Sequence, residues 1–159
     1  MIVAVLLSTL LTALPVKDTV WWDTPGGKVT EHRDQSEAVC SLMLYDGDGS
    51  VTFAWDESAQ VAVTVINSDW QFPTDWHVNV AMQVGDVWLA NRSDSVVIDA
   101  VGHGSAVAFS TDQAVHDLLR PADHIAVRTT GGEMTIRLKR DKVGMLLSRA
   151  RKCRDTIGR

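Results

Sequence analysis

HIAVRTTGGEMTIRLK, residues 124–139, decides the fold class of this chain. Within it, residues 124–130 and 133–139 each alternate apolar and polar side chains, which is the period of a strand with one buried face. Gly131 and Gly132 lie between the two runs, and two such residues between alternating runs are a strong signal for a two-residue turn. We therefore expect an antiparallel hairpin at this place.

The same strand pattern recurs through most of the preceding chain. Runs rich in apolar and β-branched residues lie at 39–45, 51–55, 61–66, 76–84, 86–90, 95–101 and 105–110. Turn residues separate these runs, and a spacing of about 8–12 residues is typical of an antiparallel sandwich or barrel. The predicted fold class is mainly β: an antiparallel β-sandwich with a short mid-chain helix and a C-terminal helix.

Two segments have the periodicity of helices. Ser110 and Gln113 have the spacing of a capping box, and Leu118 and Leu119 belong to the apolar stripe that follows. Pro121 ends this first helix. The second helix is expected to run from about residue 141 to residue 153.

The second helix brings one cysteine to the core. Its apolar stripe consists of Val143, Leu146, Leu147, Ala150 and Cys153. Cys153 therefore points inward, where Cys40 on an early strand can meet it. These two are the only cysteines of the sequence, which excludes a CxxC pair, and an even number in an exported protein suggests a disulfide. We expect the bridge Cys40–Cys153; two free buried thiols in a cytosolic protein are the alternative.

Residues 2–14, IVAVLLSTLLTAL, form one uncharged apolar run. The run is shorter than the roughly 20 residues of a membrane span, and its length is that of a signal-peptide core. No basic residue precedes it and no small-x-small site follows it, so an uncleaved anchor and a buried first strand are alternatives. We expect a periplasmic or secreted protein with no stable membrane span in its mature form.

The length of 159 residues, 45% of them hydrophobic, fits one domain with a sizeable core. The predicted organisation has four parts. They are a signal peptide or apolar leader (1–16), an extended polar arm (17–38), a β-sandwich domain with the C-terminal helix (39–154), and a tail (155–159). An irregular first strand is the alternative for the arm.

Charge is distributed unevenly. The formal net charge is -5, which argues against nucleic acid as a partner. Residues 139–159 nevertheless carry eight Lys/Arg and two Asp/Glu, a net of +6, so the remainder carries -11. Arg149, Arg151 and Lys152 avoid the apolar stripe of the last helix. They form either a solvated face that complements the helix dipole or a contact site for anionic head groups or an acidic partner.

Two groups of residues are weak candidates for metal ligands. Asp46 and Asp48 have the spacing of the first ligands of an EF-hand loop. Val51, however, occupies the glycine position of that loop, so we interpret this stretch as the tip of a hairpin.

The second metal candidate consists of Asp112, His116 and His124. The first two lie four residues apart on the mid-chain helix and share a face. No HExxH or zinc-finger spacing is present. A metal-dependent hydrolase would require all three side chains to converge in one pocket. We expect no cofactor.

The sequence holds six tryptophans, of which Trp70 and Trp76 lie close together in SDWQFPTDWH. Side by side and exposed, the two rings could stack on sugars or anchor a protein partner. Buried, they fill the core or its rim, which is the interpretation we favour.

The order of these features resembles the invasion-associated locus B family, small exported β-sandwich proteins of alphaproteobacteria. It combines an apolar leader, a cysteine on an early strand, DW with Pro73 nearby, an alternating strand that ends in VGD (84–86), a short mid-chain helix and a final helix that ends in cysteine. The resemblance covers about residues 39–154. It implies a β-sandwich in the periplasm or envelope without an established catalytic centre. The leader without basic residues and the basic C-terminal segment depart from the family.

These observations predict a non-catalytic periplasmic or envelope protein that binds a protein or another envelope partner, including an anionic surface. The sequence does not specify an oligomeric state. One alternative is a carbohydrate-binding module that uses Trp70 and Trp76. The other is a metal-dependent hydrolase that uses Asp112, His116 and His124.

Overall fold

The computed structural model describes residues 17–34, 37–56, 60–99, 105–112 and 114–157. Within these ranges the chain forms ten strands and two helices. In chain order they are β1 (Lys17–Thr24), β2 (Gly27–Arg33), β3 (Ala38–Asp46), β4 (Gly49–Trp55), β5 (Val61–Asn67), β6 (His77–Val84), β7 (Val87–Asp99), β8 (Ser105–Thr111), α2 (Val115–Leu119), β9 (His124–Thr129), β10 (Gly132–Arg137) and α3 (Arg140–Ile157). The predicted mainly β class with two helices is confirmed.

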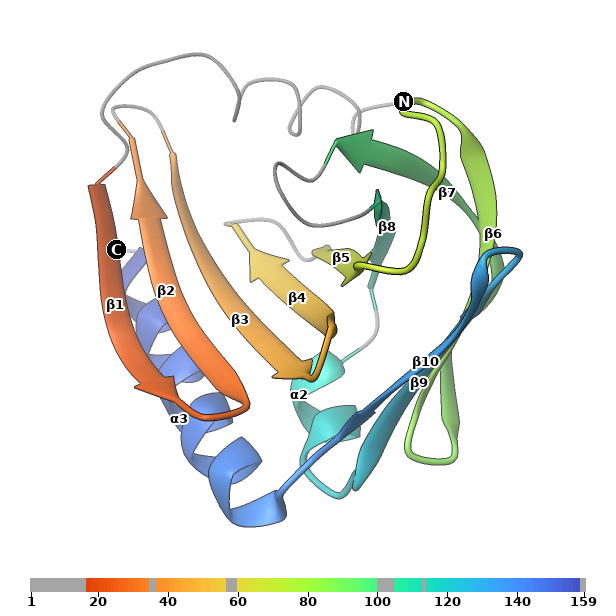
Figure 1. Cartoon of the computed structure of the whole chain (residues 1–159). Coiled ribbons are helices and arrows are strands. Elements are labelled where there is room, and N and C mark those ends of the chain that lie inside the picture. The colour runs from red at the N-terminus through yellow and green to blue at the C-terminus, as the bar shows by residue number, and fades with distance from the viewer. Residues whose placement is uncertain (1–16, 35–36, 57–59, 100–104, 113, 158–159) are drawn as a thin grey trace.

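The described strands form one antiparallel sheet in the order β1-β2-β3-β4-β5-β8-β7-β6-β9-β10. The sheet curves strongly, so that its two halves face each other (Figure 1). The Met134 side chain of β10 lies against Gly49 of β4. The Arg137 backbone N–H also donates to the Asp46 carboxylate at 3.3 Å. These contacts close the predicted sandwich.

The core lies between the two halves and is filled by alternate residues of each strand. In β4 and β5, Val51, Phe53, Val63 and Val65 are fully buried, and Phe53 is the ladder partner of Val63. The residues between them are half-buried, as the period of two requires. The alternating sequence therefore sets the strand faces directly.

Helix α3 covers the end of the sheet formed by β1, β2 and β3 (Figure 1). It approaches β2 closely, because Leu146 packs where Gly27 has no side chain. The bond between Cys40 of β3 and Cys153 of α3 confirms the predicted disulfide. The helix is thus attached to the sheet by packing and by a covalent bond.

Residues 17–38 do not form the predicted polar arm. Most of them belong to β1 and β2, the first hairpin of the sheet, whose loop is Pro25-Gly26. Gly26 has a φ of 97°, which favours glycine at this turn. Trp21 and Trp22 are half-buried on β1 and pack against the core cluster.

Three boundaries differ from the predictions. The β9–β10 loop is Thr130-Gly131, one residue earlier than expected, because Gly132 pairs with Thr129. Helix α2 has Ala114 as its N-cap with no side-chain cap, and Ser110 belongs to β8, so no capping box forms. Helix α3 continues to Ile157, so residues 155–157 are helical rather than a tail.

The predicted leader, residues 1–16, lies outside the described residues. None of the helices in the described ranges combines the length and hydrophobicity that a membrane-spanning helix needs.

Candidate functional site

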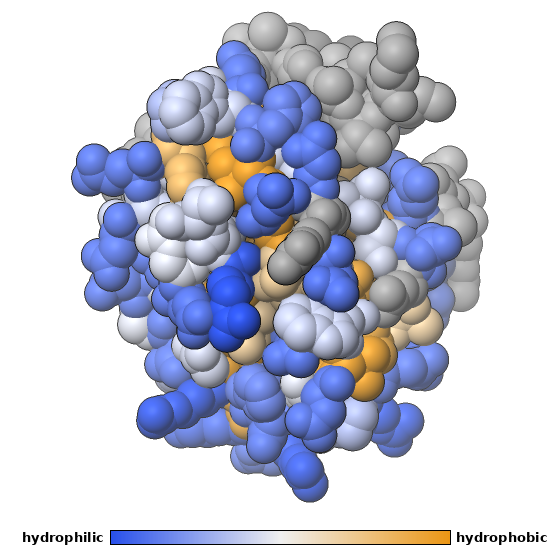
Figure 2. All heavy atoms as spheres, turned by 90° about the vertical axis from the view of Figure 1, so that its right-hand side faces the viewer, coloured by the Kyte–Doolittle hydropathy of each residue, from blue (hydrophilic) through white to orange (hydrophobic). Residues whose placement is uncertain are grey.

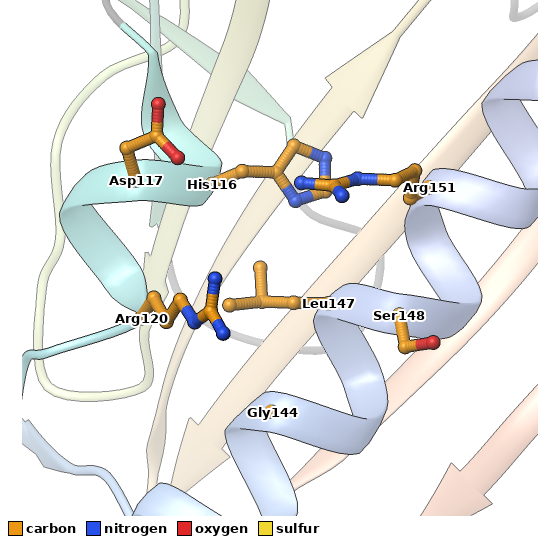
Figure 3. A pocket seen from close by; sticks show the side chains of 7 residues that line it. All are labelled: His116, Asp117, Arg120, Gly144, Leu147, Ser148 and Arg151. Atoms are coloured by element: carbon orange, nitrogen blue, oxygen red, sulfur yellow. The ribbon is translucent and has the colours of Figure 1, made fainter.

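A cleft of about 220 Å³ separates α2 from α3 (Figure 3). Its lining includes two arginines, one histidine and one aspartate. The residues that line it are His116, Asp117, Arg120, Gly144, Leu147, Ser148 and Arg151.

The helical period places these residues on facing sides of the two helices. On α2, Val115 and Leu119 are buried, which leaves His116 and Arg120 as neighbours four residues apart on the flank towards α3. On α3, Gly144, Ser148 and Arg151 follow one another at spacings of four and three residues. The glycine has open space where a side chain would stand, which keeps the cleft wide.

His116 is held in place by aromatic stacking. Its ring stacks on Trp55 of β4, with centroids 5.0 Å apart and an interplanar angle of 20°. Both ring nitrogens are buried and have no hydrogen-bond partner among the residues that the structure describes. Such orphaned polar atoms are uncommon in folded proteins and call for a physical explanation.

The environment of His116 disfavours its charged form. Burial, followed by the positive charges of Arg154 and Arg151, lowers the pKa of His116 to about 4, and Asp117 opposes this shift. The imidazole is therefore neutral at pH 7. In this state one nitrogen carries a proton that it can donate, and the other nitrogen is an acceptor.

Arg120 and Arg151 bring two guanidinium groups to the cleft from different helices (Figure 3). Both residues are exposed, and neither forms an ion pair with another described residue. The Asp117 carboxylate lies on the other side of α2 from the Arg120 guanidinium (Figure 3). Asp117 also lines the cleft, but two arginines outnumber this one carboxylate, so the cleft carries a net positive charge.

The predicted basic binding residues of α3 have different environments. The Arg149 guanidinium lies over the Trp22 ring at 4.8 Å, so this residue is part of the packing between α3 and β1. Arg151 lines the cleft and Lys152 is exposed beside it on the helix. Arg154 packs over Trp55 at 5.7 Å. Of the three predicted residues, Arg151 and Lys152 are available to a partner.

Trp70 and Trp76 do not form the exposed pair that a sugar-binding platform requires. Trp70 is 2% exposed and contacts Phe72, whereas Trp76 is 59% exposed. The favoured prediction of core packing is therefore confirmed for Trp70 and wrong for Trp76. The carbohydrate-binding hypothesis is therefore wrong for these two rings, because it requires both of them to be exposed side by side.

Several large apolar residues are exposed on the β6–β7 side. They are Trp76, Val87, Trp88 and Val96. Figure 2 looks onto the side of β6, β7, β9 and β10 and shows hydrophobic residues as separate patches among polar ones.

The predicted metal candidates do not assemble. Asp46 ends β3, and Gly47 and Asp48 form the two-residue turn that leads into β4. Gly47 has a φ of 58°. The hairpin interpretation is therefore confirmed. His124 is paired with Asp123 at 2.6 Å. Within the described ranges, no three His, Cys, Asp or Glu side chains gather as metal ligands, so Asp112, His116 and His124 do not converge.

Arg120 is the site residue that the sequence analysis missed. It lies four residues after His116, and this spacing alone would have placed it on the same helix face. Its position opposite Arg151 depends on how α2 packs beside α3, which a periodicity within one helix does not reveal.

Known protein families, curated proteins and solved structures yield no match to this chain. The site must therefore be interpreted from its own chemistry. Two unpaired guanidinium groups and one neutral imidazole form a cleft suited to binding an anionic group through charge-assisted hydrogen bonds.

Proposed function

We propose that this chain is a non-catalytic exported protein that binds an acidic envelope protein through its basic face, defined as Arg120, Arg151 and Lys152. The observation that carries the proposal is the cleft between α2 and α3, where Arg120 and Arg151 have no ion-pair partner among the described residues. Unpaired arginines on a concave surface are suited to recognising carboxylates of a partner.

The disulfide supports the compartment in this proposal. Disulfides persist in oxidising compartments such as the bacterial periplasm and are rare in the cytosol. The apolar run at 2–14 and the resemblance to the invasion-associated locus B family favour the same assignment.

The shape of the basic face favours a protein partner over a lipid surface. An anionic membrane surface attracts basic segments mainly by its surface potential, which requires no cleft. Arg120 and Arg151 instead line a cleft between two helices, which a protruding side chain can enter. The strongly acidic remainder of the chain would also be repelled by an anionic membrane.

The proposal is tested by photocrosslinking in the native host. A photoreactive residue at position 148, at the cleft, should give a covalent adduct with one envelope protein. The same residue at position 135, exposed on β10, serves as the matched control and should give no such adduct.

Charge dependence is the second part of this test. Arg120→Glu with Arg151→Glu should abolish the adduct, whereas Arg137→Glu on β10 should leave it unchanged. An adduct that survives the double reversal, or one that forms equally from position 135, would refute binding through the basic face. An adduct with lipid instead of protein would refute the choice of partner.

A further inference from the structure

We propose that the cleft between α2 and α3 binds one carboxylate group of the partner protein, held by Arg120 and Arg151 with a hydrogen bond from the His116 ring. This inference rests on the proposed function, because it names the chemical group by which the acidic partner is recognised. It makes the cleft a defined binding pocket within the broader basic face.

The donors of the cleft match the acceptors of a carboxylate. Arg120 enters from α2 and Arg151 from α3, so a group between them can accept from two guanidinium groups (Figure 3). A planar guanidinium matches a carboxylate in geometry and can bind it through two parallel hydrogen bonds. His116 adds one N–H to this set.

Such an occupant explains the orphaned donor nitrogen of His116. A buried donor without a partner costs free energy, and a carboxylate oxygen satisfies it. A water molecule could also accept this proton, but it would leave the two guanidinium groups without a counter-charge. A carboxylate satisfies the donor and compensates the charge together.

The lining favours a carboxylate over a phosphate. Leu147 lies between the two arginines, and the Ser148 hydroxyl points away from α2 (Figure 3). The cleft therefore offers two guanidinium groups, one imidazole donor and an apolar wall, and the two arginines outnumber the single carboxylate of Asp117. Two carboxylate oxygens can be satisfied by these groups, and Leu147 suits the methylene stem of a glutamate.

The charges around His116 make its ring a direct reporter of binding. The ring faces Asp117 on its own helix, Arg151 and Arg154 on α3, and the uncharged Trp55 on β4. A carboxylate bound beside the ring adds a negative charge, which favours the imidazolium. Binding should therefore raise the pKa of His116 above its value in the unliganded protein.

The test is an NMR titration of the histidine rings of the full, disulfide-bonded chain with acetate. The His116 ring signals should shift in a saturable manner, and the pKa of His116 should rise by about one unit or more. His77, exposed on β6 and paired with Asp94, should report only general salt effects. Inorganic phosphate should bind more weakly than acetate.

Substitutions assign the binding to the named groups. Arg120→Gln and Arg151→Gln should each weaken acetate binding about fivefold to tenfold, as expected for loss of one charge-assisted hydrogen bond. Arg137→Gln, the matched control on β10, should leave it unchanged. His116→Phe keeps an aromatic ring on Trp55 and removes the donor, so acetate should bind about threefold or more weakly, measured by calorimetry.

The results separate this inference from the proposed function. Absence of saturable acetate shifts at His116, an equal effect of Arg137→Gln, or tighter binding of phosphate would overturn the carboxylate site, even where position 148 crosslinks a partner. If acetate binds but no partner is crosslinked, the carboxylate site is supported and the proposed binding of an envelope protein is refuted.

The source of the carboxylate is tested with a short amidated peptide. A peptide with one central glutamate should bind at least as tightly as acetate, and its glutamine version should not bind. Binding of acetate but not of the glutamate peptide would overturn the assignment of the carboxylate to a protein.

Discussion

His116 links the stability of the fold to pH. Its pKa is lowered from 6.5 to about 4 in the folded chain, first by burial and then by Arg154 and Arg151. Above pH 6.5 the ring is neutral in both the folded and the unfolded chain, so the folded chain keeps its full stability. Between pH 6.5 and pH 4 the unfolded chain binds the proton more readily, and stability falls as the pH falls.

We expect His116→Phe to reduce this loss of stability in acid. Because the cleft exposes part of the ring to solvent, the difference between pH 7.5 and pH 4.5 should be about 1–2 kcal/mol smaller in the variant than in the native chain. Urea unfolding of both proteins at the two pH values measures it. Equal losses would show that the ring is not buried in its neutral form.

Glu31 is a second residue whose charge is held close to the core. It is 8% exposed, and its carboxylate accepts hydrogen bonds from the Trp21 indole at 3.0 Å and from the Arg33 Nε at 2.9 Å. Burial raises the pKa of Glu31, but these hydrogen bonds and the charges of Arg33 and Lys17 outweigh it and lower the pKa. The resulting stability is present above the unfolded pKa near 4.5 and is lost as the pH falls through the lower folded pKa.

We expect Glu31→Gln to lower the free energy of unfolding at pH 7 by about 1–3 kcal/mol, because the amide cannot compensate Arg33. The matched control is Glu133→Gln, whose ion pair with Arg128 is solvent-exposed and should contribute little. Urea unfolding at pH 7 compares the two. The prediction fails if both substitutions have the same small effect.

At the scale of single residues, periodicity identified some environments and missed others. Cys153 could be placed because it lies on a regular apolar helix stripe, and Cys40 because it lies on a strand. Trp70 and Trp76 could not be distinguished, since the segment between them is a loop without a period, in which Asp75 has a φ of 65°. Their burial depends on tertiary packing alone.

Among the elements, β1 shows why an irregular edge strand is hard to distinguish from an extended arm. Its first four residues are exposed, and a bulge between Val20 and Trp22 interrupts the alternation that would indicate a strand. The cleft escaped prediction for a different reason. Helix periodicity showed which residues share a face within α2 or α3, but not that the two helices are neighbours.

Helix α3 depends on its covalent attachment to β3. The disulfide joins residues 113 positions apart, and closing so long a loop restricts the unfolded chain. The chain-entropy model gives a stabilisation of up to about 4–5 kcal/mol. We expect the double variant Cys40→Ala, Cys153→Ala to have a free energy of unfolding about 3–4 kcal/mol lower than that of the native chain. Urea unfolding at pH 7, followed by far-UV circular dichroism, measures this difference. An unchanged midpoint would contradict it.

The fold of the whole molecule encloses a core and also separates the basic helix α3 from the acidic remainder of the chain. The net charge is -5, yet the segment from 139 to 159, most of which forms α3, carries +6. One end of the fold is therefore basic on an acidic molecule. Such an asymmetry orients an approaching partner by long-range attraction and makes association sensitive to salt.

The compartment in which the molecule folds determines whether α3 is attached covalently to the sheet, because the bond between Cys40 and Cys153 requires oxidising conditions. We expect protein isolated from the native host to lack its apolar N-terminal segment and to resist alkylation at both cysteines until it is reduced. Intact-mass spectrometry after alkylation, with and without prior reduction, measures both properties. Protein retained in the cytosol of the same host is the control and should be alkylated at both thiols without reduction. A full-length native chain with two free thiols would remove the case for export, and the basic face would then require a cytosolic partner.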